Sequence, residues 1–224
     1  MQSVLVIGLG RFGRHLAMKL AELGNEVMVI DKDEAAVNRV APFVTSAHIG
    51  DCMDEQVIES IGVRNFDVCF VCISDNFQSS LEITWQLKEA GAKEIVSKTD
   101  REMHAKFLLQ IGANAVIHPE RDMAWRTAVK YSSTHIFDYI EFAPEYAITE
   151  IDVPSSWVGM SIRDLRVREK FRINIIATRT DEHIYPTVNA DHVFTVDEHL
   201  YVSGNQKDID RKSTRLNSSH RIRS

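Results

Sequence analysis

Three glycines near the start of the chain have the spacing of a nucleotide-binding turn. Gly8, Gly10 and Gly13 follow the apolar run 3–7 and precede a helix-forming segment. Gly8 permits a tight turn, Gly10 lets backbone N–H groups approach a phosphate, and Gly13 lets the helix lie close to the strand. The N-terminus of that helix directs partial positive charge toward the phosphate. The pattern predicts a mononucleotide or dinucleotide pocket.

An acidic residue at the end of the second apolar run supports this prediction. Asp31 ends the segment 26–31, eighteen residues beyond Gly13. Its carboxylate can accept hydrogen bonds from both ribose hydroxyls of a nucleotide. The same charge should repel a 2′-phosphate, which argues against NADP.

Further polar residues follow the predicted strands. Arg11, inside the glycine turn, can reach the terminal phosphate of ATP or a phosphate bound by a neighbouring subunit; a solvated surface arginine is the alternative. After the third strand, Asp51 can accept the adenine amino group, and the Gly50 backbone can approach the base. Asn76, after the fourth strand, is equally interpretable as a ligand contact or a helix N-cap.

Two more features have competing interpretations. Glu120 stands at a helix start, where it either complements the helix dipole or helps to hold Mg²⁺ or Ca²⁺ near the phosphates. Cys69 and Cys72 have metal-ligand spacing, but their odd separation inside a strand directs them to opposite faces. We therefore expect these two cysteines to lie in the core.

The elements that position these residues alternate regularly. Strands are predicted at 3–7, 26–30, 44–49, 67–73, 94–98 and 115–118. Helices are predicted at 11–23, 33–40, 54–61, 76–90 and 101–111. Because several strands are apolar on both faces, they should be buried in a parallel sheet. The pattern predicts an α/β, Rossmann-type doubly wound parallel sheet.

A different pattern follows. A crossover helix is predicted at 119–137, and its apolar face is either a subunit interface or ordinary core; that face includes Met123, Trp125, Ala128 and Val129. Strands at 147–153, 173–178 and 199–203 and a helix at 161–170 then indicate a small α+β C-terminal lobe, which should pair with a second copy. We predict three regions, 1–137, 138–210 and a tail at 211–224.

Composition restricts the class of protein. The 224 residues carry a net charge of −6, but the tail holds five Lys or Arg and no acid, so residues 1–210 have a net charge of −11. The tail resembles translated vector sequence, and a basic arm for nucleic acid is the alternative. The acidic body argues against a nucleic-acid partner. Three cysteines fit a reducing cytosol, and neither a secretory leader nor an apolar run long enough to span a membrane is visible.

Several segments together resemble one family, the RCK-domain (TrkA-N/TrkA-C) gating subunits of the Ktr and Trk potassium-uptake systems. They are 8–13, Asp31, Gly50-Asp51, 64–66 and 117–123. The resemblance covers residues 1–210 and is nearest to the soluble Ktr subunit. It implies a cytoplasmic, non-enzymatic regulator at the inner face of the membrane, a homodimer that assembles into an octameric ring beneath a multi-span potassium transporter subunit.

The resemblance also implies ligands. ATP and ADP, with NAD or NADH in relatives, would compete for the pocket, with Arg11 at the γ-phosphate and Glu120 binding Mg²⁺ or Ca²⁺ at the dimer interface. The residues expected at the nucleotide are Gly8, Gly10, Arg11, Phe12, Gly13, Asp31, Lys32, Gly50, Asp51, Cys52, Ile73, Ser74, Asn76 and Lys98. The small lobe of many relatives binds cyclic di-AMP, and the matching residues are Arg168, Asn174, Ile175 and His183. Their usual proline is replaced here by Val188 or Asn189.

Two other classes of function are weighed against this one. An NAD-dependent oxidoreductase would need a hydride-transfer residue set with a His or Lys acid–base group. A redox-sensing repressor would need a DNA-reading helix and a basic face. No such feature is evident before the tail, so the sequence favours a regulatory subunit.

Overall fold

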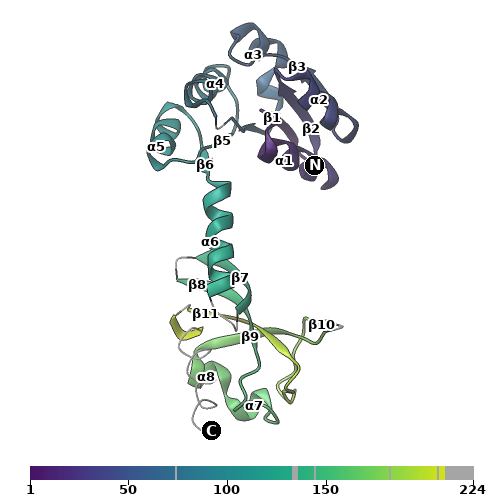
Figure 1. The fold of residues 1–224 in the computed structure, drawn as a ribbon, viewed down its shortest axis with the longest axis vertical. Helices are drawn as coiled ribbons and strands as arrows, with labels where there is room; N and C mark the ends of the chain where they lie inside the picture. The colour runs from purple at the N-terminus through teal and green to yellow at the C-terminus, as the bar shows by residue number, and fades with distance from the viewer. Residues whose placement is uncertain (74, 133–135, 144, 182, 206, 210–224) are drawn as a thin grey trace. The chain divides into compact units, whose positions relative to one another are not determined.

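The computed structural model describes residues 1–73, 75–132, 136–143, 145–181, 183–205 and 207–209 (Figure 1). The chain divides into two compact units, Met1–Asp122 and a second that begins at Met123. Each unit has its own sheet and its own hydrophobic core. Our domain boundary at residue 137 stays a prediction, and the tail at 211–224 lies outside the described residues.

Unit 1 contains the predicted six-stranded parallel sheet. Its strands are β1 Ser3–Ile7, β2 Glu26–Asp31, β3 Ser46–Ile49, β4 Val68–Val71, β5 Ile95–Lys98 and β6 Ala115–Ile117. They lie in the order β3-β2-β1-β4-β5-β6, and every neighbouring pair is parallel. The chain reverses its direction of winding between β1 and β4. The loops after these two strands therefore diverge and leave a crevice at the carboxyl edge of the sheet.

Helices cover both faces of this sheet. They are α1 Arg11–Glu22, α2 Glu34–Val40, α3 Glu55–Ile61, α4 Phe77–Glu89 and α5 Glu102–Ile111, with short 3₁₀ turns η1 Ala41–Phe43 and η2 Val63–Asn65. Val4 and Val6 of β1 pack in one core cluster with residues of α1 and α2. Leu5 and Ile7 pack in the other with residues of α3 and α4. Successive residues of β1 thus face opposite layers, as a strand buried on both sides requires.

The two cysteines of the fourth strand region confirm the prediction of opposite faces. Cys69 belongs to the cluster beneath α3 and α4, and Cys72 to the cluster beneath α1 and α2. Both thiols are free, and burial raises the pKa of each to about 12. They are core residues rather than a metal-ligand pair.

Unit 2 is built on a five-stranded antiparallel sheet in the order β10-β9-β11-β8-β7. Its elements, after the helix α6 Pro119–Ser132 that spans the boundary between the units, are β7 Ile136–Ala143, β8 Tyr146–Asp152, α7 Ile162–Leu165, α8 Val167–Phe171, β9 Ile173–Arg179, β10 Ile184–Tyr185 and β11 His199–Asn205. The core of unit 2 is partly aromatic. The Trp157 ring lies 5.0 Å from the Phe171 ring and 5.9 Å from the Phe194 ring, centroid to centroid. The predicted α+β lobe is confirmed.

Two boundaries of the prediction in this region are wrong. The crossover helix was expected to continue to residue 137, but α6 ends at Ser132 and β7 begins at Ile136. The segment becomes a strand because it pairs with β8 in a hairpin, with Ile140 opposite Ile148. The helix-like spacing of apolar residues in this segment gives no sign that it pairs with β8.

The helix expected at 161–170 is two short helices. The chain breaks at Arg166, which has a left-handed φ of 47°. In a continuous helix Leu165 and Val167 would point about 200° apart. The break allows both side chains to enter the core, where they are 5% and 3% exposed. The predicted N-cap is present, because the Asp164 N–H donates to Ser161 Oγ.

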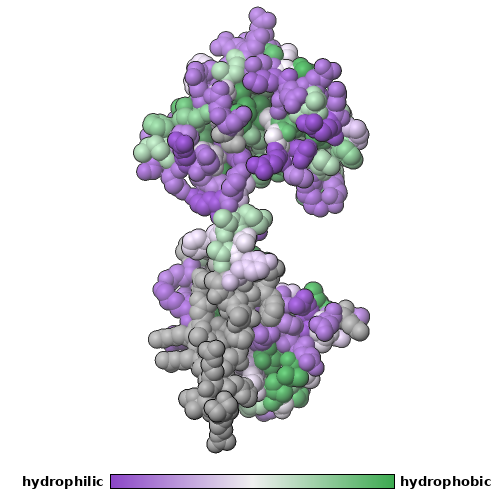
Figure 2. All heavy atoms as spheres, viewed as in Figure 1, coloured by the Kyte–Doolittle hydropathy of each residue, from purple (hydrophilic) through white to green (hydrophobic). Residues whose placement is uncertain are grey.

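Within the described part of the chain, no helix is both long and apolar enough to cross a bilayer. The visible surface of unit 1 carries mostly hydrophilic side chains (Figure 2).

Candidate nucleotide-binding site

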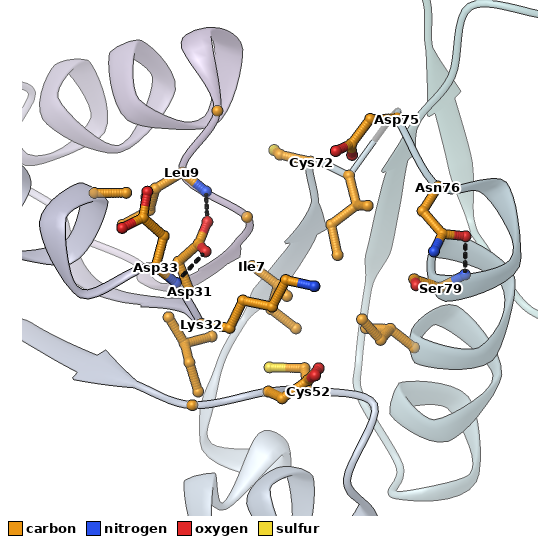
Figure 3. Close-up of a pocket in the computed structure, with 18 of the residues that line it drawn as sticks. Ile7, Leu9, Asp31, Lys32, Asp33, Cys52, Cys72, Asp75, Asn76 and Ser79 are labelled. Carbon is orange, nitrogen blue, oxygen red and sulfur yellow. Dashed lines mark hydrogen bonds between the residues drawn. The ribbon is translucent and has the colours of Figure 1, made fainter.

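A pocket of about 530 Å³ opens at the carboxyl edge of the unit 1 sheet. Its walls come from the ends of β1 and β2, the loops after β3 and β4, and the helices α1, α2 and α4 (Figure 3). The residues that line it are Ile7, Gly8, Leu9, Gly10, Arg11, Arg14, Ile30, Asp31, Lys32, Asp33, Ala36, Arg39, Gly50, Asp51, Cys52, Met53, Cys72, Ile73, Asp75, Asn76, Ser79 and Ile83. This position matches the crevice that the strand order predicts.

The glycine turn has the geometry that its spacing predicts. Gly8 has a left-handed φ of 92°, and a Cβ there would lie 3.0 Å from Ile73 Cγ1. A Cβ on Gly13 would lie 2.0 Å from the Gly8 carbonyl oxygen, so only glycine lets α1 approach the turn this closely. At Gly10 a Cβ would meet nothing within 4 Å. Gly10 therefore faces the open space in which a phosphate would approach the backbone.

Asp31 holds the turn from the neighbouring strand. Its Oδ2 accepts a hydrogen bond from the Leu9 N–H at 2.5 Å, and its Oδ1 accepts one from the Asp33 N–H at 2.9 Å (Figure 3). An ionised carboxylate has about four lone-pair sites. Each oxygen thus retains acceptor capacity for a ribose hydroxyl while it anchors the loop.

The loop after β3 supplies Gly50, Asp51 and Cys52. Asp51 Oδ1 accepts the Met53 N–H at 3.0 Å, so this carboxylate fixes its own loop. Burial raises the pKa of the Cys52 thiol to about 12, and the nearby charges of Asp51 and Asp31 act in the same direction. Cys52 is therefore a neutral, packed wall of the pocket.

The loop after β4 brings Ile73 and Asn76 into the pocket, and Ser74 lies outside the described residues. Asn76 Oδ1 accepts the Ser79 N–H at 3.2 Å, which is the N-cap bond of α4. The N-cap alternative is therefore confirmed; Asn76 also lines the pocket, and its contact with a ligand stays a prediction.

Three residues predicted at the nucleotide do not line the pocket: Phe12, Gly13 and Lys98. Lys98 is only 8% exposed at its side chain, and its Nζ lies 2.8 Å from Glu120 Oε1 and 5.9 Å from the centre of the Phe12 ring. The hydrogen bond from Lys98 lowers the pKa of Glu120, and the charge of Arg11 contributes. Arg11, Lys98 and Glu120 thus belong to one electrostatic group beside the glycine turn. Their contact with a ligand stays a prediction.

Glu120, the predicted cation-binding residue, forms an ion pair with Lys98. Across the residues that the structure describes, no three or more His, Cys, Asp or Glu side chains are arranged to hold a metal ion. Glu120 is 65% exposed at its side chain. A cation there would need further ligands from a nucleotide or a second chain.

The sequence reasoning missed several lining residues. Arg14 is three positions from Arg11 on α1, so helical periodicity was a usable signal for it. Arg39, in the last turn of α2, had no such signal, since its approach to the pocket depends on how α2 packs on the sheet. Asp75 directly precedes the predicted Asn76, and Ser79 follows it by three residues, in the first turn of α4.

The four residues matched to a second ligand lie in unit 2. Arg168 is on α8, Asn174 and Ile175 are on β9, and His183 precedes β10. Asn174 is exposed, whereas Ile175 packs against the core, because adjacent strand residues face opposite sides. A role for these four residues stays a prediction.

Both units match known domain families. The TrkA-N domain model matches residues 4–119, and the TrkA-C domain model matches residues 148–214. The Ktr system potassium uptake protein C of Bacillus subtilis (strain 168) is 40% identical over 211 residues, which are 94% of this chain and 96% of that protein. The Ktr system potassium uptake protein A of the same organism is 35% identical over 206 residues, 92% of this chain and 93% of that protein.

Solved structures share the fold. The GsuK channel aligns with a TM-score of 0.69 at 16% identity and covers 96% of this chain and 39% of its own. The GsuK channel bound to NAD aligns with a TM-score of 0.64 at 17% identity, covering 92% of this chain and 38% of its own. This chain therefore spans well under half the length of those chains. At such identity the similarity concerns the fold alone.

The glycine turn generates a stability prediction. Gly13→Ala should destabilise unit 1 by about 1–3 kcal/mol, because the new methyl group overlaps the Gly8 carbonyl and forces α1 outward. Gly10→Ala is the matched control; its methyl group meets open space, so its cost should stay below about 1 kcal/mol. Urea unfolding followed by circular dichroism measures both. Equal destabilisation by the two substitutions would contradict the close contact.

Proposed function

The chain belongs to the family of TrkA-N and TrkA-C domain proteins, and from this premise we propose that it is a nucleotide-binding regulatory subunit of a potassium-uptake system. The observation that carries the proposal is the pocket itself, with its glycine turn, the open face at Gly10 and the Asp31 carboxylate. ATP and ADP are the proposed ligands, with NAD or NADH as further ones. The printed names of the relatives support a role in potassium uptake.

The regulatory step proposed is a response to the third phosphate. A nucleotide can bias a two-state protein only through contacts that differ between the states. Arg11 lines the pocket at the start of α1, where it can contact the γ-phosphate of ATP. ADP lacks that group. Arg11 would therefore distinguish ATP from ADP by its contact with the γ-phosphate.

Glu120 is proposed to join this response through a divalent cation. Mg²⁺ or Ca²⁺ is bound by carboxylate and phosphate oxygens, and Glu120 already lies within the electrostatic field of Arg11. A cation at Glu120 would compete with Lys98 for the same carboxylate. Divalent cations should therefore matter more for ATP than for ADP.

Assembly is the second part of the proposal. Met123 and Trp125 of α6 are 61% and 59% exposed, and such apolar side chains are typical of a subunit interface. We propose a homodimer, further assembled into an octameric ring, that acts at the cytoplasmic face of a membrane potassium transporter subunit. Cyclic di-AMP is proposed as a second ligand of unit 2.

An oxidoreductase is the competing class. It shares the nucleotide pocket but would transfer hydride to a substrate. The relatives over almost the whole chain are named as potassium uptake proteins, which favours regulation over catalysis.

Replacement of Asp31 tests the ribose contact. Asp31→Ala should weaken the binding of ATP, ADP and NADH alike, by about 1.5–3 kcal/mol of binding free energy, because hydrogen bonds to a charged group are lost. Isothermal titration calorimetry measures the three affinities. Asp67→Ala is the matched control, since Asp67 also accepts a backbone N–H, from Ser3 at 3.0 Å, but lies outside the pocket. Unchanged binding in Asp31→Ala would refute the ribose assignment.

Replacement of Arg11 tests the switch. Arg11→Ala should cost ATP about 1.5–3 kcal/mol of binding free energy and should cost ADP much less, since one charge-assisted hydrogen bond is lost. Glu120→Gln should abolish any divalent enhancement of ATP binding and spare ADP. Lys19→Ala, on the same helix but ion-paired with Glu22, is the control.

Potassium flux provides the functional readout of the same variants. With a potassium transporter subunit in proteoliposomes, the wild-type protein should give different flux in ATP and in ADP, and Arg11→Ala should remove the difference. Equal losses for both nucleotides would mean that Arg11 only supports the pocket, and Lys98 would then be the next candidate sensor.

Light scattering tests assembly. Residues 1–210 should form a dimer or a larger species at micromolar concentration, since the exposed face of α6 would be buried between subunits. Trp125→Glu should shift the population toward smaller species. A monomer of about 24 kDa for the unsubstituted protein would contradict the ring.

A further inference from the structure

A buried glutamine next to the nucleotide pocket has no role in the function proposed above. Gln86 lies on the face of α4 that carries the pocket residues Ser79 and Ile83, at helical spacing from both. It is 9% exposed, and its Nε2 donates a hydrogen bond to the Met53 carbonyl oxygen at 3.2 Å. Met53 lines the pocket from the loop after β3. Gln86 therefore links α4 to the loop that forms another wall of the pocket.

Packing alone does not account for an amide at this position. Gln86 Oε1 is buried and has no hydrogen-bond partner among the residues that the structure describes. A buried amide with an unsatisfied oxygen costs free energy that an apolar side chain of similar size would not cost. The adjacent core positions of α4, Ile83 and Leu87, are apolar. What the amide adds over such a side chain is its bond to the Met53 carbonyl.

The loop after β3 is held at its start and at Met53. At the start, the Gly50 N–H donates to the Asp31 carbonyl oxygen at 3.0 Å. Further along, the Met53 N–H donates to Asp51 Oδ1, and the Met53 carbonyl accepts the bond from Gln86. The first of these bonds joins the loop to β2, and the second lies within the loop. The bond from Gln86 is the one that joins the loop to α4, so its loss would loosen this wall relative to the helix.

We propose that Gln86 is a positioning residue for the nucleotide, because its bond to the Met53 carbonyl holds the loop 50–53 in the position that binds the base. The proposal rests on the function proposed above and adds to it a residue that does not itself contact the ligand. Figure 3 shows Cys52 of this loop and Ser79 of α4 on two walls of the pocket. A wall that is in place for only a fraction of the time lowers the apparent affinity by that fraction.

Thiol labelling of the full chain without ligand tests the first step. Cys52 lies inside the loop and is 4% exposed, whereas Cys69 of β4 is 0% exposed in the same core cluster. Gln86→Met should speed the labelling of Cys52 by iodoacetamide about fivefold, as expected for the loss of one neutral hydrogen bond, and should leave the rate at Cys69 unchanged. Peptide mass spectrometry separates the two sites. A general loss of stability would instead accelerate both cysteines.

Two further substitutions separate the hydrogen bond from packing. Gln86→Leu also removes the donor but has a different shape, so it should accelerate Cys52 as Gln86→Met does. Gln78→Met is the matched control. Gln78 lies on the same helix, is exposed, and donates to Glu82 rather than to the loop. Its replacement should leave Cys52 at the wild-type rate.

Nucleotides test the second step. Saturating ADP should slow the labelling of Cys52 in Gln86→Met toward the wild-type rate, because a ligand that needs the wall in place stabilises it there. Calorimetry should show ATP and ADP weakened by the same factor, about two- to fivefold, since both carry the adenosine that the loop is proposed to contact. Arg11→Ala, in contrast, is expected to weaken mainly ATP.

The outcomes separate the two proposals. A wild-type rate at Cys52 in Gln86→Met, or equal acceleration of Cys52 and Cys69, overturns the role of Gln86 and leaves the nucleotide pocket standing. Faster labelling of Cys52 with unchanged nucleotide affinity also overturns it, because the loop would then not serve the ligand. Failure of every nucleotide to bind the wild-type protein refutes the proposed function and, with it, the positioning role of Gln86.

Discussion

The hydrogen bond from the Leu9 N–H to the Asp31 carboxylate, 2.5 Å long, is the contact on which the pocket depends. It joins the turn after β1 to the end of β2, and the second Asp31 oxygen holds the start of the next loop through the Asp33 N–H. The helix α1 packs against the same turn, with Gly13 in close contact with the Gly8 carbonyl. Two constraints of different kinds, one electrostatic and one steric, therefore fix the backbone that faces a phosphate.

Much of unit 1 could be predicted because its signals are local. Strands buried on both faces appear as continuous apolar runs, and the residues that end them lie at one edge of a parallel sheet by topology alone. The same topology predicts Asp31 and Asp51 at one pocket and leaves Asn76 as either a ligand contact or a helix N-cap; all three residues line the pocket. It did not find Arg39, since the side chain reaches the pocket only through the packing of α2 on the sheet.

In unit 2 the prediction failed where structure depends on a distant partner. The strand β7 exists because β8 pairs with it, and a helical period cannot reveal such a pairing. The break at Arg166 arises because Leu165 and Val167 are both needed in the core. Helix propensities of single residues do not include the burial of both side chains in one core. Elements set by long-range contacts are thus the ones that sequence patterns describe least well.

Cys52 has a consequence for the chemical reactivity of the pocket. Its thiol is 4% exposed, and burial with two neighbouring carboxylates raises its pKa to about 12. A pKa this high keeps Cys52 in the thiol form at neutral pH, whereas the thiolate is the species that attacks electrophiles and oxidants. Cys52 therefore adds no reactive nucleophile to the pocket wall beside Asp51. Occupancy can change with the charge and shape of the ligands present, while Cys52 contributes packing and no reactive thiolate.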